Sequence, residues 1–246
     1  MIRALRGAGR CSPKPHSEVR MPEVERFFIA VGDIHGDVDN LARIPDIGQA
    51  DGVIVTGDLT IRGDRPEGKR VIDAVRAVNP AVHAQIGNMD YQDIDDWLTA
   101  EGINIHRRVV ELAPGLGLMG IGWSTPTPFG TPSEISEEGL ARWIEETHVL
   151  ARDYARLVVV VHTPPYGTVT DLLPSGVHVG SPAVRAFLER VQPVLCVTGH
   201  IHESRGRDVI GNTVVVNPGP LSLGGYVRLQ VKPDCHDGVI AALGTI

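Results

Sequence analysis

Seven side chains that are able to bind a metal ion stand at the ends of short apolar segments of this sequence. Each has a glycine, a proline or another small residue close beside it. Two are carboxylates, one is a primary amide and four are imidazoles. Such a mixed set suits Mn, Fe, Zn, Co or Ni better than calcium, which takes oxygen donors. The seven residues are Asp33, His35, Asp58, Asn88, His162, His200 and His202.

The number of donors predicts two metal ions. Seven ligands are too many for a single tetrahedral site, but they suit two ions about 3.5–4 Å apart that share one bridging carboxylate. Taken alone, Asp33 and His35 fit a tight turn followed by a helix cap about as well as a metal site. The metal site is the stronger interpretation because four later segments end in side chains of the same kind.

The segments that precede these side chains have the length and composition of buried strands. Between them lie stretches with helical spacing, and strands that alternate with helices favour parallel pairing. Since ligands bind at the carboxyl edge of such sheets, the seven side chains are expected to converge there. The predicted strands span residues 27–31, 52–56, 81–86, 157–161 and 194–198, and the predicted helices span 37–50, 66–78, 93–101, 136–151 and 181–191.

The remaining strands read differently. Residues 109–112 and 116–121 are shorter apolar segments around Pro114-Gly115, and a loop rich in proline and threonine follows at 122–133. The tail reads as antiparallel strands, with Gly211-Asn212 as a two-residue hairpin turn. These strands are predicted at residues 208–210, 213–216, 226–231 and 238–243.

Length and composition fit one α/β domain over residues 26–246, in a chain of 246 residues. The formal net charge of -7 argues against bulk nucleic-acid binding, and no apolar run approaches a membrane span. The three cysteines are scattered and form no CxxC pair, which favours a reducing, cytoplasmic compartment. The oligomeric state cannot be derived from the sequence.

Residues 1–25 are expected to be a flexible N-terminal extension. The first twenty residues are rich in arginine and proline without periodicity, and they lack the apolar core of a secretory signal. A targeting peptide is the alternative, and Met21 is a candidate for the natural start.

The arrangement resembles the calcineurin-like metallophosphoesterase family. The motifs of that family run in the order GDxHG, GDxx, GNxD or GNHE, a histidine at a strand end, and GHxH. All five are present here in that order and span about two thirds of the chain. The matching segments are residues 32–36 (GDIHG), 57–60 (GDLT), 87–90 (GNMD), His162 and 199–202 (GHIH).

The resemblance implies a fold and a role for each ligand. The fold would be two mixed β-sheets packed as a sandwich and flanked by helices, in four layers. Two divalent ions, Mn foremost and Fe, Zn, Co or Ni as alternatives, would activate a shared hydroxide to attack phosphorus. Asn88 would also be catalytic, with its amide NH2 free to orient a small phosphoester substrate. By motif, Asp33, His35 and His202 would hold one ion, Asn88, His162 and His200 the other, and Asp58 would bridge them.

Two departures from the protein-phosphatase branch favour a phosphodiesterase. That branch has a histidine and an acid that assist the leaving group, and this chain has Met89 and Ile61 in their places. GNxD instead resembles small bacterial and archaeal phosphodiesterases. A phosphomonoesterase or protein phosphatase is the alternative. A non-catalytic interaction scaffold is a weaker one, because scaffolds of this fold tend to lose ligands and all seven are intact.

Other residues near the motifs remain open. Arg62 resembles a phosphate-gripping arginine of the GDxxDRG block, or it is a neutral surface residue. Trp123 and Phe129 either border the substrate or pack the loop 122–133 down, and His178 lies in a loop that could reach the site. The other histidines match no motif and are expected in surface or core positions; they are His16, His83, His106, His148 and His236.

Overall fold

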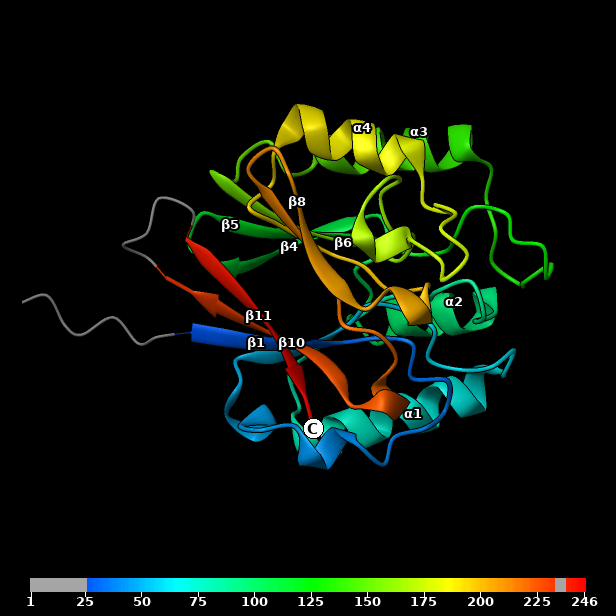
Figure 1. The fold of residues 1–246 in the computed structure, drawn as a ribbon. Coiled ribbons are helices and arrows are strands. Elements are labelled where there is room, and N and C mark those ends of the chain that lie inside the picture. Colours follow the sequence, from blue (N-terminus) through cyan, green and yellow to red (C-terminus); the bar gives the residue numbers. More distant parts are fainter. Residues whose placement is uncertain (1–25, 233–237) are drawn as a thin grey trace, which may run out of the picture.

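The computed structural model describes residues 26–232 and 238–246. The predicted extension, residues 1–25, lies outside the described residues. The described chain forms two mixed β-sheets (Figure 1). The first sheet has the order β11-β10-β1-β2-β3, and its strands are β1 (Arg26–Val31), β2 (Gly52–Val55), β3 (Val82–Ala84), β10 (Gly225–Val231) and β11 (Val239–Thr245).

The second sheet has six strands in the order β4-β5-β6-β7-β9-β8. The strands β5, β6, β7 and β9 pair in parallel, whereas the two edge strands β4 and β8 are antiparallel to their neighbours. Its strands are β4 (Arg108–Ala113), β5 (Leu116–Ile121), β6 (Arg156–Val161), β7 (Leu195–Val197), β8 (Gly206–Ile210) and β9 (Thr213–Asn217).

Alternate side chains of each buried strand face two different cores, as the two-residue period of a strand requires. In β1, Phe28 and Ala30 belong to the core between the sheets, whereas Ile29 and Val31 face the helices. In β6, Val158 and Val160 likewise belong to the core between the sheets, and Val159 belongs to the core between the second sheet and its helices. Strands that are apolar on both faces are therefore buried on both faces.

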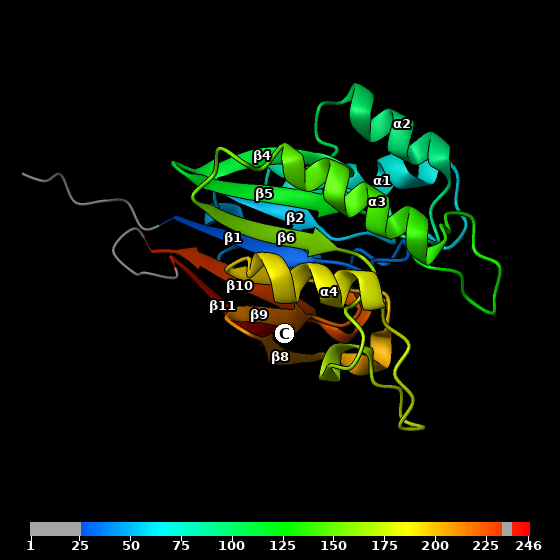
Figure 2. The same cartoon turned by 90° about the horizontal axis from the view of Figure 1, so that it is seen from above.

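Two helices cover each outer face and complete four layers (Figure 2). The helices α1 (Arg65–Val78) and α2 (Gln92–Ala100) pack against the first sheet, and α3 (Glu137–Val149) and α4 (Pro182–Val191) pack against the second. Side-chain caps from Asp64, Ser136 and Ser181 start three of the four helices. The predicted sandwich with flanking helices is confirmed. Within the described ranges, no helix has the length and apolar composition that crossing a membrane requires.

The predicted helix at residues 37–50 is wrong. The structure has two short 3-10 turns there, η1 (Leu41–Arg43) and η2 (Ile47–Gln49). Pro45 supplies no backbone N–H for a continuous helix, and Asp46 takes a left-handed backbone conformation with φ 59°. Leu41, Ile44 and Ile47 are still buried, which explains their helix-like spacing. The hairpin at Gly211-Asn212 is confirmed by the pairing of Ile210 with Thr213.

Candidate dinuclear metal centre

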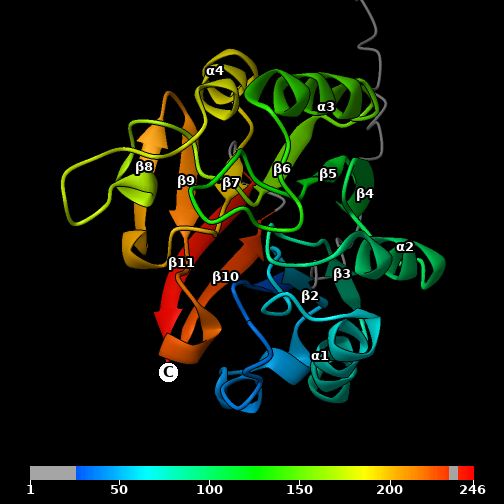
Figure 3. The same cartoon turned by 90° about the vertical axis from the view of Figure 1, so that its right-hand side faces the viewer.

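The seven predicted ligands follow five strands from both sheets. Asp33 and His35 follow β1, and Asp58 and Asn88 follow β2 and β3 of the same sheet. In the second sheet, His162 follows β6, and His200 and His202 follow β7. The loops that carry them gather on the side of the molecule that faces the viewer in Figure 3. The centre therefore lies where the carboxyl edges of the two sheets meet.

Six of the seven form two groups in which the candidate donor atoms lie within 4.8 Å of one another. One group is Asp33, His35 and His202, and the other is Asp58, His162 and His200.

Asp58 links the two groups. Its Oδ2 lies 3.7 Å from His35 Nε2, and its Oδ1 lies 3.5 Å from His162 Nε2. The seventh residue, Asn88, joins the second group because its Oδ1 lies 3.0 Å from His162 Nε2. The structure thus gathers all seven side chains.

Backbone carbonyls fix the tautomers of two ligand histidines. Nδ1 of His35 lies 3.1 Å from the carbonyl of Thr60, and Nδ1 of His162 lies 3.2 Å from that of Thr56. A carbonyl oxygen only accepts, so each Nδ1 carries the hydrogen. In the neutral rings, Nε2 then presents a lone pair toward the centre, as a metal ligand must.

The donor set fits cations at this place. With Nδ1 protonated, the lone pair of His162 Nε2 faces Asn88 Oδ1, another acceptor, at 3.0 Å. Two acceptors at this distance need a positive charge to hold them, either a proton or a metal ion. Accordingly, although burial opposes it, the carboxylates of Asp58 and Asp33 raise the pKa of His162 to about 9. The Nε2 atoms of His35 and His202 also face each other, 3.1 Å apart, in the other ligand group.

The carboxylates are ready to ligate at neutral pH. Burial would raise the pKa of Asp33, but the hydrogen bond from His202 and the surrounding histidines lower it to about 2. The pKa of Asp58 is also lowered, since the attraction of His162 outweighs its burial. Burial and the neighbouring His162 lower the pKa of His200 to about 4, which keeps that ring neutral. Ionised carboxylates and neutral imidazoles are the forms that bind divalent metals.

The backbone around the ligands is unusual in two ways. Four of the seven ligand residues have left-handed φ values, which are sparsely populated by residues other than glycine. They are Asp33 (φ 49°), His35 (φ 50°), Asp58 (φ 52°) and His200 (φ 69°). In addition, a Cβ on Gly87 would lie 2.1 Å from Asp58 Oδ1, and one on Gly57 would lie 2.6 Å from His162 Nδ1. Glycine at both positions lets the ligands approach the main chain.

The orientation of Asn88 depends on residues without a motif. Its Nδ2 donates to Thr131 Oγ1 at 3.0 Å, and that hydroxyl donates to Glu134 Oε1 at 2.5 Å. Burial opposes ionisation of Glu134, but hydrogen bonds from Thr127 and Thr131 lower its pKa to about 2. The relay aims Asn88 Oδ1 at His162 and uses one of the two amide hydrogens. The expectation of a fully free NH2 is therefore corrected, because Thr131 accepts one of the two N–H groups.

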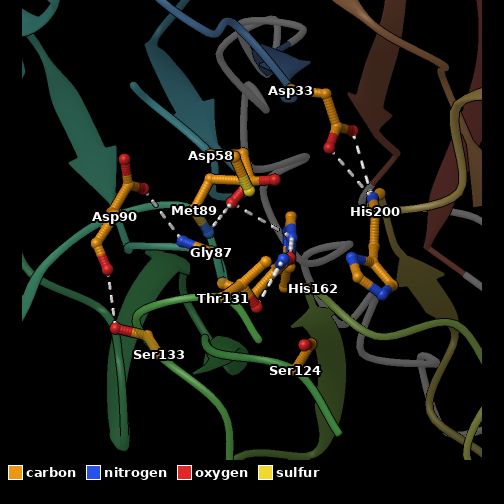
Figure 4. A network of polar contacts seen from close by, with 12 residues as sticks. Asp33, Asp58, Gly87, Met89, Asp90, Ser124, Thr131, Ser133, His162 and His200 are labelled. Atoms are coloured by element: carbon orange, nitrogen blue, oxygen red, sulfur yellow. Dashed lines mark hydrogen bonds and ion pairs between the residues drawn. The ribbon is translucent and has the colours of Figure 1, made fainter. Parts of the chain in front are cut away.

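Asp90, the last residue of GNxD, holds the ligand loops together. Its carboxylate is fully buried and accepts from the backbone N–H groups of Leu59, Thr60 and Gly87 and from the Thr60 hydroxyl. Figure 4 shows Asp90 beside Gly87 and Ser133. Burial and the nearby Asp58 raise the pKa of Asp90 to about 7. Asp90 is part of the GNxD motif, but the sequence did not indicate that its carboxylate holds the ligand loops together.

A cavity of about 1070 Å³ opens over the centre. Of the two predicted substrate residues, Arg62 lines it, and Nη2 donates to the carbonyls of Phe129 and Gly130 at 2.9 Å. Trp123 is not among the described residues that line the cavity. Its ring lies edge-on to the ring of Trp143, with centroids 5.3 Å apart. This position favours the packing role for Trp123.

The other open residues are also placed. Phe129 lines the cavity, together with Ile61 and Met89. His178 is not among the described residues that line it, and its Nδ1 donates to Asp171 Oδ1 at 2.8 Å. Of the histidines without a motif, His83 lies in β3, His106 packs beside Trp143 and His148 beside Phe187, whereas His16 and His236 lie outside the described residues.

Sequence comparisons identify related proteins. The family model for calcineurin-like phosphoesterases matches residues 28–204. The chain is 34% identical over 202 residues to the uncharacterized protein MJ1162 of Methanocaldococcus jannaschii, covering 79% of this chain and 88% of that protein.

Solved structures share the fold at low sequence identity. The protein TT1561 of Thermus thermophilus aligns with a TM-score of 0.66 and 18% identity, over 90% of this chain and 99% of that one. A dimetal phosphatase from Danio rerio aligns with a TM-score of 0.57 and 13% identity, over 89% and 96%. A putative 5'-nucleotidase from Staphylococcus aureus aligns with a TM-score of 0.59 and 18% identity, over 91% and 54%.

Proposed function

The chain belongs to the calcineurin-like phosphoesterase family, and from that premise we propose that it is a two-metal phosphodiesterase. The observation that carries the proposal is the position of Asp58. One carboxylate oxygen lies near His35 of the first ligand group and the other near His162 of the second. A single carboxylate between two groups of donors is what two ions sharing a bridge require.

The residues present have defined parts to take in the reaction. Asp33, His35 and His202 would hold one ion, Asn88, His162 and His200 the other, and Asp58 both. When bound, the ions would lower the pKa of a water molecule and stabilise negative charge on the phosphate oxygens. We favour Mn, because the donors mix imidazole nitrogen with carboxylate and amide oxygen.

The chain itself would orient the substrate. The second N–H of Asn88 is available to a phosphate oxygen, since the first is held by Thr131. Hydrolysis adds the water oxygen to phosphorus and breaks the bond from phosphorus to the leaving oxygen. Met89 and Ile61, which line the cavity, have no proton to give that oxygen, so it would leave as an anion or take a proton from solvent.

Two features favour diesters over monoesters. A monoester dianion carries one more negative charge near neutral pH than a diester. Among the described residues that line the cavity, Arg62 is the one arginine or lysine, and its guanidinium is already engaged by two backbone carbonyls. The second feature is the missing leaving-group acid, which the protein-phosphatase branch of the family has.

The test compares aryl diesters and monoesters after metal removal and reconstitution with Mn. We expect higher kcat/KM for bis(4-nitrophenyl) phosphate than for 4-nitrophenyl phosphate, and rates that fall steeply as the pKa of the leaving group rises. General acid help, which Ile61 and Met89 do not supply, is typically worth about 10²- to 10⁴-fold for poor leaving groups. His200→Ala is the matched control and should abolish both activities. A preference for monoesters, or rates that do not vary with leaving-group pKa while chemistry limits turnover, would contradict the proposal.

A further inference from the structure

The mouth of the cavity over the metal centre is apolar. Beyond the ligands, the residues that line it include aliphatic, thioether and aromatic side chains from several separate loops. Several of them are well exposed, among them Phe129 at 78% and Ile61 at 62%. Exposed apolar side chains that gather around a cavity mark a binding site for an apolar group. The six that matter are Ile61, Met89, Phe129, Leu173, Val179 and Ile201.

Ile61, Met89 and Phe129 form one wall of the cavity, and hydrogen bonds connect the loops that carry them. Arg62 N donates to Met89 O at 2.9 Å, and the Arg62 guanidinium donates to Phe129 O. The loop that carries Phe129 is also tied to the ligand loop, because Ser133 N donates to Asn88 O at 3.0 Å. Phe129 is therefore held at the mouth by its main chain, while its ring stays open to a ligand.

The other three form a second wall from the loops that follow β6 and β7. Leu173 N donates to Val177 O at 2.9 Å and closes a tight loop. Ser204 Oγ donates to Leu172 O at 2.8 Å, which joins this loop to the segment after His202. Figure 3 shows both loop regions on the side of the molecule where the sheets present their carboxyl edges. Two fixed apolar walls thus border one cavity.

The charges at the mouth offer little to a polar or multiply charged substrate. Among the described residues that line the cavity and are not metal-ligand candidates, Arg62 and Glu203 are the two charged ones. Arg62 is engaged by carbonyls, and Glu203 would repel a second phosphate. The hydroxyl groups of Thr125 and Ser222 are neutral. A substrate with one phosphate and an extended apolar substituent fits this lining best.

We propose that this protein acts on amphiphilic phosphodiesters, in which one ester substituent is an extended apolar chain held between the walls of Phe129 and Leu173. The inference rests on the proposed hydrolase function. It specifies the class of substrate that the cavity admits. A protein partner is a poorer fit, because these side chains line the same cavity as His35, Asp58 and His202.

The kinetic test is a series of 4-nitrophenyl alkyl phosphates from methyl to hexyl, below their aggregation limits, with the full-length Mn-loaded protein. Burying one methylene fully is worth about four-fold in affinity and burying half of it about two-fold, so kcat/KM should rise roughly 30-fold or more across the series. Phe129→Ser and Leu173→Ser should each lower the hexyl-to-methyl ratio at least about three-fold. Leu150→Ser, an exposed apolar residue outside the cavity, is the matched control and should leave the ratio unchanged.

Binding gives a second readout that does not need turnover. Hexylphosphonate should bind the Mn-loaded protein at least about ten-fold more tightly than methylphosphonate in calorimetry, and Phe129→Ser should narrow that difference. Turnover of the methyl ester without any dependence on chain length would overturn the inference and leave the hydrolase standing. Chain-dependent binding without turnover of any ester would instead refute the hydrolase and retain the apolar site. Equal binding of both phosphonates would overturn the inference regardless of turnover.

Discussion

Acid should destabilise this protein through one histidine outside the metal centre. His106 Nδ1 accepts a hydrogen bond from Gly122 N at 2.9 Å, and its ring lies edge-on to Trp143 with centroids 5.0 Å apart. Burial, together with Arg107 and Arg108, lowers the pKa of His106 from 6.5 to about 3. Protonation would also remove the acceptor that Gly122 uses, and Gly122 begins the loop that carries Phe129 to the cavity.

The direction and size of the effect follow from linkage. The folded state keeps His106 neutral down to about pH 3, whereas the unfolded state takes up the proton below pH 6.5. The stability that the neutral ring of His106 contributes is therefore fully present above pH 6.5 and is lost as the pH falls toward 3. Each pH unit between these values costs about 1.4 kcal/mol, so His106 alone should remove about 2 kcal/mol of unfolding free energy at pH 5.

The assay is urea unfolding of metal-free wild type and two variants at pH 5, 6 and 7. His106→Asn keeps an acceptor for Gly122, so it should lose the part of the pH dependence that comes from His106 but little stability at pH 7. His106→Leu should lose the pH dependence as well, and it should cost about 1–3 kcal/mol at pH 7 because Gly122 N–H is left without its partner. The other titratable groups, Asp90 and the remaining histidines among them, contribute equally to all three proteins, so the difference from wild type isolates His106. Parallel pH profiles for wild type and His106→Asn would refute this reasoning.

Three further predictions concern the centre and its loop. Asp58→Asn should reduce bound Mn below two ions per chain and lower kcat/KM at least about 100-fold, as measured by elemental analysis and kinetics; unchanged stoichiometry would contradict a bridging role. Thr131→Val should lower metal affinity about 10- to 100-fold by releasing the Asn88 amide, and Thr131→Ser should restore it in metal titrations; equal affinities in all three proteins would exclude the relay. Trp123→Ala should lower the free energy of unfolding by about 2–4 kcal/mol in urea titrations, with a smaller effect on KM. A large change in KM with little change in the free energy of unfolding would instead indicate that Trp123 borders the substrate.

The candidate metal ligands could be picked out in the sequence because their positions depend on local features. Each follows a short apolar segment, and parallel strands buried on both faces must place their carboxyl ends at one edge. Within each sheet this rule brings the candidate ligands to one edge. Asp33 and His200 follow strands of different sheets and meet because the two carboxyl edges adjoin: His200 N donates to both oxygens of Asp33, at 3.0 and 3.2 Å. The helices were predictable for the same reason, since caps such as Ser136 and an apolar stripe lie within a few turns.

The helix predicted at residues 37–50 was wrong because a periodic pattern of buried side chains does not by itself require helical hydrogen bonds. Leu41, Ile44 and Ile47 are buried at intervals of three, which resembles one face of a helix. The spacing shows only which side chains face the core. The backbone conformation of this segment depends on Pro45 and Asp46. The division of the strands into two sheets was similarly beyond local reasoning, because strand pairing joins segments such as β1 and β10 across most of the chain.

The types and the order of the motif residues were enough to indicate which side chains converge on the centre and to which family the chain belongs. The tertiary structure alone decided what surrounds that centre. The orientation of Asn88 depends on Thr131 and Glu134, and the guanidinium of Arg62 is taken up by a loop more than sixty residues away. Such contacts join irregular loops, whose side chains have no period from which a partner can be read. The chemistry of the centre is therefore encoded locally, whereas the walls that would select its substrate exist only in the folded chain.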